Sequence, residues 1–201
     1  MFLLDTSLGQ QIAQISWLEW VGFVSTIACI YLAAKENILN WPISIFSIVI
    51  SAILFFESQL YGDFALQFYF LFTAFYGWWF WLKKKRLHEK PVVSIGKKHW
   101  LLIVFITLVL TAIMGYLLDH YTNTNVPYED AFCTALSLVA QIMLTKKILE
   151  NWILWIVVDT CYVALYLYKD LNLYAILYAL LVLIAAKGYI DWRKSYQIAS
   201  K

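Results

Sequence analysis

Long apolar stretches separated by short polar connections dominate the chain from residue 17 onward. A helix needs about 20 mainly apolar residues to cross roughly 30 Å of hydrocarbon. We predict seven membrane-spanning helices, over 17–34, 39–57, 61–82, 99–118, 129–145, 150–168 and 172–190. Pro42, Pro91 and Pro127 fall in connections or first helical turns, where a missing N–H costs little. The pattern predicts an all-α integral membrane protein.

Composition supports this class. Hydrophobic residues make up 63% of the 201 residues and charged residues 14%, whereas a soluble domain is about 45–50% apolar and about 25% charged. A net charge of +2 is too small to indicate a nucleic-acid partner. The three cysteines stand singly, without the spacing of a disulfide framework or metal site. Residues 1–16 carry Asp5 and no lysine or arginine, so we expect a surface segment rather than a cleavable signal peptide.

The chain also matches itself, without a gap, when it is shifted by 111 residues. The coincident residues include Asn40 with Asn151, Trp41 with Trp152, Gly77 with Gly188 and Trp81 with Trp192. An internal repeat in a chain this apolar predicts a transporter built from two like halves. The halves differ where Ile48 aligns with Asp159 and where Gln67 aligns with Tyr178, and we expect substrate contacts at these mismatches.

Positive charge gathers on one side of the predicted spans. If successive connections alternate between the two sides, 14 of the 15 Lys and Arg residues share one side and Lys169 alone lies opposite. The positive-inside rule then places the N-terminus outside and the C-terminus in the cytoplasm. A missed or invented span would destroy this one-sided distribution, so the charges also support the count of seven.

The direction of the spans predicts how the two halves are related. Each half has three spans, so halves joined directly would be inverted, and the span at 99–118 turns the chain once more to make them parallel. We therefore predict a 3+1+3 parallel-repeat arrangement. Its parts are a surface segment (1–16), a first repeat (17–82), a basic loop and linker helix (83–128), a second repeat (129–192) and a cytoplasmic tail (193–201).

Polar side chains within the spans are the candidates for function, because hydrocarbon makes them costly. Asp159 lies near the middle of its span, where an ionised carboxylate costs about 2.5–3.5 kcal/mol on insertion scales. It either lines the substrate pathway or is satisfied by tyrosine or threonine hydroxyls that hold the halves together. Spacings of three and four place it on one helical face with four aromatic residues, Trp152, Trp155, Tyr162 and Tyr166.

Other spans supply a second set of candidate contacts. Gln67 and Thr73 share a face of the span at 61–82, with Tyr76 beside it, while Gln141 lies in the span at 129–145 and Tyr178 on the outer part of the last span. An unpaired amide at this depth is costly, so we expect Gln67 and Gln141 to contact the substrate. The serines of these spans are expected to serve close helix packing instead.

Six of the ten tryptophans form two groups with different expected roles. Four that lie beside basic residues are expected to anchor the protein at the membrane interface, namely Trp78, Trp79, Trp81 and Trp192. Trp152 and Trp155 instead share a face with Asp159. Aromatic faces beside amide and carboxyl groups suit a flat heteroaromatic ligand, above all a cationic one that stacks on a ring.

Motifs for chemistry are missing from the sequence. It contains neither a glycine-rich phosphate loop nor a His-Glu metal motif, and its serines and cysteines stand in no recognisable nucleophile setting. We therefore expect no enzyme, no cofactor and no metal, and we expect transport to be passive or ion-coupled.

Two stretches have distinctive local sequences. One runs from Leu66-Gln67-Phe68-Tyr69 to Tyr76-Gly77-Trp78-Trp79. The other runs from Asn151-Trp152 through Trp155-Ile156-Val157-Val158-Asp159 to Leu165-Tyr166, followed by a span that closes at Gly188 and Trp192. Over most of residues 17–195 the chain resembles the PnuC-type vitamin transporter family. Its architecture also resembles the sugar-transporting SWEET proteins, whose interior helix prolines this chain lacks.

The resemblance implies a bacterial inner-membrane transporter that moves an unphosphorylated vitamin precursor by facilitated diffusion, with cytoplasmic phosphorylation trapping it. The implied substrate is nicotinamide riboside, a cationic pyridinium nucleoside. Thiamine is also a cation and suits the same residues, and a substrate-binding subunit that needs a separate energising ATPase is a further alternative. Competition uptake distinguishes the first two, and transport by the chain alone distinguishes the third.

The hypothesis assigns a role to each candidate residue. Aromatic walls come from Trp152, Trp155 and Tyr162, and hydrogen bonds to the amide or ribose from Gln67 and Gln141. Asp159 sets the polarity, and the two halves rock about the central site. Asn40 and Asn151, at matching span starts, are candidates for an inner gate, although capping of their own helices is the favoured role.

Overall fold

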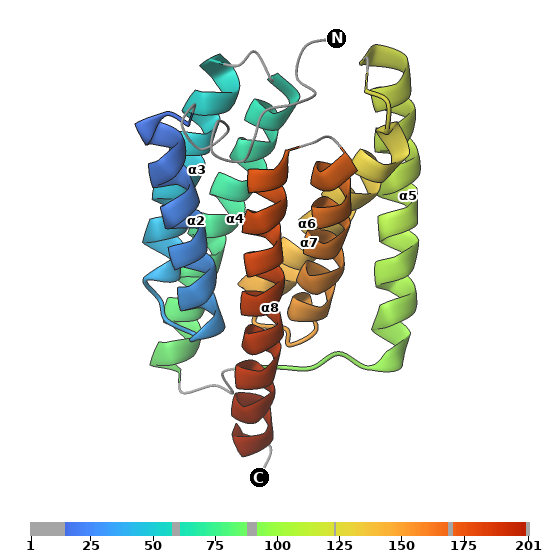
Figure 1. Ribbon diagram of the computed structural model, residues 1–201. Coiled ribbons are helices and arrows are strands. Elements are labelled where there is room, and N and C mark those ends of the chain that lie inside the picture. The colour runs from blue at the N-terminus through green and yellow to red at the C-terminus, as the bar shows by residue number, and fades with distance from the viewer. Residues whose placement is uncertain (1–14, 58–60, 88–91, 123, 169–170, 200–201) are drawn as a thin grey trace.

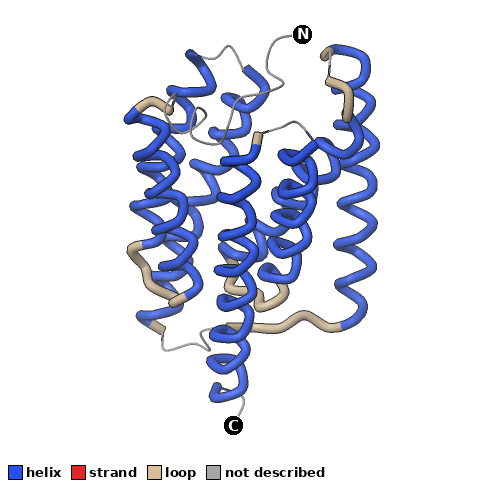
Figure 2. The backbone as a smooth tube through the Cα atoms, in the orientation of Figure 1, coloured by secondary structure: helices blue, strands red, loops and turns tan. Residues whose placement is uncertain are grey.

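The computed structural model describes residues 15–57, 61–87, 92–122, 124–168 and 171–199. Within them the chain forms seven helices (Figures 1 and 2). They are α2 (Trp17–Ala34), α3 (Asn40–Glu57), α4 (Tyr61–Arg86), α5 (Lys97–Tyr121), α6 (Pro127–Thr145), α7 (Asn151–Tyr168) and α8 (Asn172–Ala199). Among the described residues, five helices are long and apolar enough to cross a membrane, namely α2, α3, α5, α7 and α8. The predicted surface segment lies outside the described residues up to residue 14.

The helices begin near the predicted span bounds, but three end later than predicted: α5 by three residues, and α4 and α8 by more. α4 continues to Arg86 and α8 to Ala199, beyond the apolar stretches that defined the spans. Hydropathy marks only the part of a helix that hydrocarbon surrounds, whereas backbone hydrogen bonding continues until a residue breaks it. At the start of α2 a capping box holds the first turn, because Glu19 N donates to Ser16 Oγ (3.2 Å) and Ser16 N donates to Glu19 Oε2 (2.7 Å).

Helices α2 and α6 end in the same kind of turn, at positions 111 residues apart. Glu36 and Lys147 both have left-handed backbones, with φ of 53° and 55°. After each, an N–H reaches back five residues to a carbonyl, from Asn37 to Leu32 and from Ile148 to Met143, at 2.9 Å in both cases. This pattern is a Schellman C-cap, so the repeat seen in the sequence extends to backbone geometry at these two turns.

Helix packing follows the same scheme in both halves. In the first half α3 packs against α2 and α4, and in the second half α7 packs against α6 and α8. The halves meet where α2 packs on α8 and where α4 packs on α6 (Figure 1). Among the described helices, α5 packs against α6 alone and stands at the edge of the bundle. A path between the two halves is therefore bordered by α2, α4, α6 and α8.

Four buried tryptophans form the centre of the largest core, and we call Trp41, Trp81, Trp152 and Trp192 the tryptophan cluster. Their rings contact one another in a row, with centroid distances of 5.3 Å (Trp41 to Trp81), 5.9 Å (Trp81 to Trp192) and 5.4 Å (Trp192 to Trp152). The row is symmetric with respect to the repeat. Its two outer residues, Trp41 and Trp152, occupy equivalent positions in the repeat, and so do its two inner residues, Trp81 and Trp192. Each outer ring also lies against a helix backbone, Trp41 at Gly77 and Trp152 at Gly188.

The prediction that Trp81 and Trp192 anchor the protein at the membrane interface is wrong. Both side chains are buried, and each indole N–H donates to a backbone carbonyl of the other half. Trp81 Nε1 donates to Thr145 O (3.2 Å) and Trp192 Nε1 donates to Ala33 O (3.1 Å). These rings lie on the inward faces of α4 and α8, whereas Trp79 on the other face of α4 is exposed as predicted for the group.

Candidate substrate site

Asp159 lies midway along α7 and is enclosed by the surrounding helices, with 4% of its surface exposed. Among the described residues, none donates a hydrogen bond to its carboxyl group. An electrostatic interaction does connect it with the Tyr178 side chain on α8. Buried carboxyl groups in folded proteins normally have hydrogen-bond partners. Asp159 is therefore a group that a polar or cationic ligand can satisfy.

Tyrosines extend from Asp159 towards the C-terminal end of α7 and the N-terminal end of α8, and we call Tyr162, Tyr166, Tyr174 and Tyr178 the tyrosine ladder. Ring centroids lie 4.8 Å apart for Tyr162 and Tyr178, 5.2 Å for Tyr166 and Tyr178, and 5.4 Å for Tyr166 and Tyr174. At the far end, Phe23 of α2 packs edge-on against Tyr174 at 5.3 Å. The structure therefore brings three predicted residues together, Asp159, Tyr162 and Tyr178.

A second polar group joins α4 to α6. Gln141 Nε2 donates to Thr73 Oγ1 at 3.4 Å, and the Thr73 hydroxyl donates to Phe70 O at 2.9 Å. Tyr69 Oη donates to the backbone carbonyl of Leu138 at 2.7 Å. Thr73 and Gln141 were predicted as substrate contacts, and the structure places them side by side. Tyr69 was not among the predicted substrate contacts, although it lies one turn before Thr73 and therefore on the same face of α4.

The hydrogen bond from Tyr69 leads to a prediction of stability. Tyr69→Phe is expected to lower the free energy of unfolding by about 0.6–1.5 kcal/mol, because it removes an interhelical hydrogen bond and leaves the ring in place. The measurement is thermal unfolding of the purified protein in detergent. Tyr121→Phe is the matched control, since Tyr121 is an exposed residue at the end of α5. Equal unfolding temperatures for the two variants would contradict the prediction.

The predicted aromatic walls occupy different surroundings. Trp152 is enclosed in the tryptophan cluster, with 1% of its surface exposed. Trp155 is half-buried, contacts both the tryptophan cluster and the core between α6 and α7, and lies one helical turn from Asp159. Tyr76 stacks on Phe80 of its own helix at 6.0 Å, and Gln67 is half-buried in the N-terminal part of α4. Along α7, Trp155 therefore lies one turn from Asp159, whereas Trp152 lies about two turns from it.

The gate candidates Asn40 and Asn151 are buried first residues of α3 and α7. Their side-chain amides donate to the carbonyls of Asn37 (2.7 Å) and Ile148 (2.6 Å), three residues earlier. An N-terminal cap works in the opposite sense, with the side-chain oxygen accepting from an N–H of the first turn. The favoured prediction of helix capping is therefore wrong. These amides instead brace the turn that leads into each helix.

A cavity of about 690 Å³ lies elsewhere, between the N-terminal part of α6 and the C-terminal part of α7. Its wall includes Glu129, Phe132, Cys133, Cys161 and Tyr168, and it contains none of the predicted site residues. Cys161 is two residues after Asp159, which corresponds to a rotation of about 200° around the helix. The cavity therefore borders a different face of α7 from the one that carries Asp159.

Charge is distributed unevenly around the candidate site. The helical segments 17–34, 39–57, 61–82, 99–118, 129–145, 150–168 and 172–186 contain neither lysine nor arginine. Asp159 is thus a carboxyl group in surroundings of aromatic rings, amides and hydroxyls, without a basic side chain in the same helical segments. An arrangement of this kind favours a neutral or cationic aromatic ligand and disfavours an anionic one.

Known proteins resemble this chain over nearly its whole length. The nicotinamide riboside transporter PnuC of Escherichia coli is 28% identical over 96% of this chain and 92% of its own length. The riboflavin/roseoflavin transporter RibM of Streptomyces davaonensis is 23% identical over 89% of this chain and 85% of its own. A crystal structure of the vitamin B3 transporter PnuC superposes with a TM-score of 0.74, at 26% identity, covering 96% of this chain and 89% of that one.

A family model also matches most of the chain. Residues 16–194 match the model described as nicotinamide mononucleotide transporter, and this range contains α2 to α7 in full and most of α8. Members of this family are membrane transporters and not enzymes, in agreement with the prediction from the sequence. The match covers most of the chain and every predicted site residue, so the chain belongs to the nicotinamide mononucleotide transporter family.

Proposed function

We propose that this protein imports nicotinamide riboside across the bacterial inner membrane by facilitated diffusion, and that phosphorylation in the cytoplasm then traps it. The observation that carries the proposal is Asp159, a buried carboxyl group without a hydrogen-bond donor among the described residues, beside the tyrosine ladder. The names of the relatives support it, since PnuC of Escherichia coli is a nicotinamide riboside transporter. The pyridinium ring of the riboside is flat and cationic, which suits both features.

Charge favours the riboside over the mononucleotide in the family's description. A mononucleotide carries a phosphate, and its negative charge would enter hydrocarbon-depth surroundings that hold Asp159 and no lysine or arginine. Phosphate binding normally uses arginine, lysine or a helix N-terminus. The riboside has no phosphate, and its positive charge would face the carboxylate. The substrate therefore enters before phosphorylation.

The proposed site lies between the two halves. Tyr162, Tyr178 and Trp155 would contact the ring from the α7–α8 side. From the α4–α6 side, Gln141 and Thr73 would hydrogen-bond the amide or ribose, with Gln67 and Tyr76 further along α4. Binding would replace the long Gln141–Thr73 hydrogen bond of 3.4 Å with better contacts to the ligand.

The proposed architecture is a 3+1+3 parallel repeat, with the N-terminus outside and the C-terminus in the cytoplasm. Support comes from the matching helix contacts of the two halves and from α5, which packs on α6 at the edge of the bundle. The turns after α2 and α6 have the same backbone geometry and the same direction along the bundle (Figure 2). Positive charge at that end supports the proposed orientation. Rocking of the two halves would open the site to each side in turn.

Uptake by the purified chain in proteoliposomes tests the proposal. Labelled nicotinamide riboside is expected to equilibrate across the membrane without ATP, and unlabelled riboside is expected to compete. Thiamine, riboflavin and nicotinamide mononucleotide serve as rival competitors. If thiamine competes more strongly than unlabelled riboside, nicotinamide riboside is not the preferred substrate. If the mononucleotide competes more strongly, the argument from charge is wrong.

Binding measured alongside uptake separates a transporter from a binding subunit. A ligand that binds the folded state raises the unfolding temperature, so the riboside is expected to stabilise the protein in detergent. Stabilisation without any equilibration in proteoliposomes would show that a separate energising protein is required. A chemically altered riboside after incubation would show an enzyme instead.

A further inference from the structure

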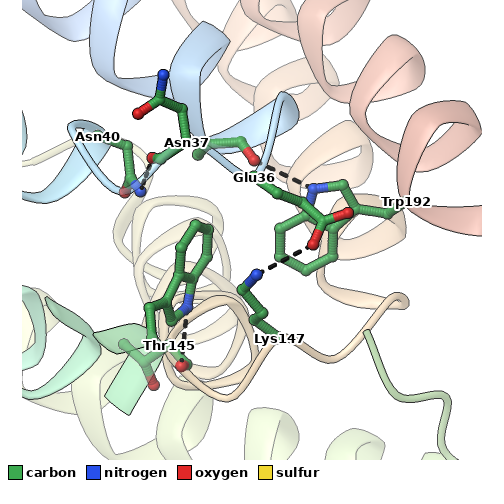
Figure 3. A network of polar contacts seen from close by, with 8 residues as sticks. Glu36, Asn37, Asn40, Thr145, Lys147 and Trp192 are labelled. Atoms are coloured by element: carbon green, nitrogen blue, oxygen red, sulfur yellow. Dashed lines mark hydrogen bonds and ion pairs between the residues drawn. The ribbon is translucent and has the colours of Figure 1, made fainter. Parts of the chain in front are cut away.

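Two charged residues that are equivalent in the repeat face each other across the junction of the two halves. Glu36 follows α2 and Lys147 follows α6, and 111 residues separate them. Lys147 Nζ lies 3.0 Å from Glu36 Oε2, and the two side chains are mostly withdrawn from water, with 10% and 18% of their surfaces exposed (Figure 3). Residues related by a repeat contact each other only near the axis that relates the two halves. Glu36 and Lys147 therefore mark that axis.

The backbone at both positions is costly for these residue types. Left-handed residues at helix C-termini are most often glycine, sometimes asparagine, because other side chains crowd the backbone there. Glu36 and Lys147 hold this conformation, and they are the positive-φ residues other than glycine in the described chain. A strained conformation at equivalent sites, with charged side chains that pair with each other, indicates a use for those side chains.

Further contacts surround the pair, and each connects one half to the other. The ammonium group of Lys147 lies 4.3 Å from the centroid of the Trp81 ring, a cation–π contact between α4 and the turn after α6. Beside it are the reciprocal indole hydrogen bonds, from Trp81 to the Thr145 carbonyl and from Trp192 to the Ala33 carbonyl. Figure 3 labels Trp192, Thr145 and Lys147 in this group. These contacts close the junction at the basic end of the molecule.

We infer that the Glu36–Lys147 pair is the inner gate of the transporter, a step that rests on the proposed function. A pathway between two rocking halves opens along the axis that relates them, and this pair occupies that axis at the basic end. Like charges at the two equivalent positions would repel, whereas glutamate and lysine attract each other and hold the end closed. Opening to the cytoplasm separates them, and the negative charge of Glu36 then faces the departing cation.

Another ion pair between the halves is placed differently. Lys35 Nζ lies 2.8 Å from Asp191 on α8, and the hydrogen bond to this carboxylate raises the pKa of the Lys35 ammonium. Both side chains are accessible to water, and exposed pairs contribute little. The repeat-equivalent positions of this pair are Lys146 and Phe80, which have no such interaction. Lys35 and Asp191 therefore lie at the edge of the junction and are not assigned to the gate.

Reversible cross-linking tests the gate. In a variant without native cysteines (Cys29→Ala, Cys133→Ala, Cys161→Ala), Glu36→Cys and Lys147→Cys are joined by a bifunctional methanethiosulfonate that dithiothreitol removes. Cross-linking is expected to abolish riboside uptake in proteoliposomes, while the riboside still raises the unfolding temperature because the site remains open from outside. Dithiothreitol is expected to restore uptake. Undiminished uptake in the cross-linked protein, or failure of the two cysteines to be joined, would overturn the gate.

A matched control uses a side-chain pair that joins the basic loop to the second half and does not connect the two halves. Ser94 hydrogen-bonds Glu150 at the start of α7, where Val93 also pairs with Ile148 in a short β-bridge. Joining Ser94→Cys to Glu150→Cys is expected to leave uptake unchanged. If uptake is also lost in this control, the reagent causes the loss, and the assignment of Glu36 and Lys147 to the gate is wrong.

A labelling experiment that uses no substrate tests the gate independently of the proposed function. Thr73→Cys is labelled by an impermeant thiol reagent applied from the basic side, with and without the double change Glu36→Gln and Lys147→Gln. Faster labelling is expected when the pair is broken, whichever molecule the protein carries. An unchanged labelling rate would overturn the gate, whereas absent riboside uptake by the cysteine-free parent would overturn only the proposed substrate.

Discussion

Gly77→Ala is expected to lower the free energy of unfolding by about 3 kcal/mol or more, at the upper end of the range for overpacked cores. An ideal Cβ at this position would lie 2.2 Å from Cη2 of Trp41 and 2.4 Å from Cζ2. The Trp41 ring cannot move aside easily, because it is 1% exposed and packs against Trp81. Thermal unfolding in detergent measures the effect. Gly188→Ala is expected to cost less, since its Cβ would lie 2.7 Å from Trp152.

Three further variants control this prediction. Gly96→Ala is expected to be neutral, because no atom lies within 4 Å of its Cβ position. Gly115→Ala meets Tyr128 at 2.4 Å, but that ring is half exposed and can rotate away at small cost. Trp41→Phe shortens the side chain, so Gly77→Ala is expected to be less harmful in that background. Equal unfolding temperatures for Gly77→Ala and Gly96→Ala would show that the close contact does not exist in solution.

Asp159→Asn is expected to reduce the affinity for nicotinamide riboside about a hundredfold. A cation about 6 Å from the carboxylate, at an effective dielectric constant of about 20, gains about 3 kcal/mol, and about 1.4 kcal/mol corresponds to tenfold. The amide keeps the shape of the side chain and removes its charge. Thermal stabilisation by the riboside and uptake in proteoliposomes measure the loss. The unliganded protein is expected to unfold at a similar or higher temperature, because a neutral amide is less costly to bury.

The same variants can also show that Asp159 has a structural role and does not bind the substrate. If Asp159→Asn binds the riboside normally while Asp159→Leu fails to fold, Asp159 holds the helices together and does not recognise the substrate. Asp119→Asn is the matched control, since it removes an exposed carboxylate near the end of α5 and is expected to change neither binding nor stability. A hundredfold loss of riboside affinity in this control would show that the effect of Asp159→Asn comes from the change in net charge.

Several features of the fold were predictable because they depend on short stretches of chain. The position of each helix follows from runs of apolar residues long enough to cross hydrocarbon, and all seven were placed within a few residues at their starts. The late ends of α4 and α8 were missed because Lys83–Arg86 and residues 191–199 are polar yet remain helical. Polarity indicates where hydrocarbon ends, and it does not stop backbone hydrogen bonding.

The candidate site was predictable in part. The i, i+3 and i, i+4 spacings that place Asp159 and Tyr162 on one face of α7 depend only on helix geometry, and these residues do lie with Tyr178. The same spacing grouped Trp152 with Asp159, yet Trp152 is enclosed in the tryptophan cluster at the basic end. Spacing along one helix identifies a face but cannot say what covers each part of it.

The sequence by itself determined the class of protein, the helices, the repeat and the charge asymmetry, because hydrophobicity and helical period act locally along the chain. Only the tertiary structure decided which residues meet between the halves. Trp81 and Trp192 stand beside basic residues, where interfacial anchors are expected, and the contacts of α2 with α8 and of α4 with α6 bury them instead. Glu36 and Lys147 appear unremarkable in separate polar turns, and they become partners because the fold brings equivalent turns to a common axis.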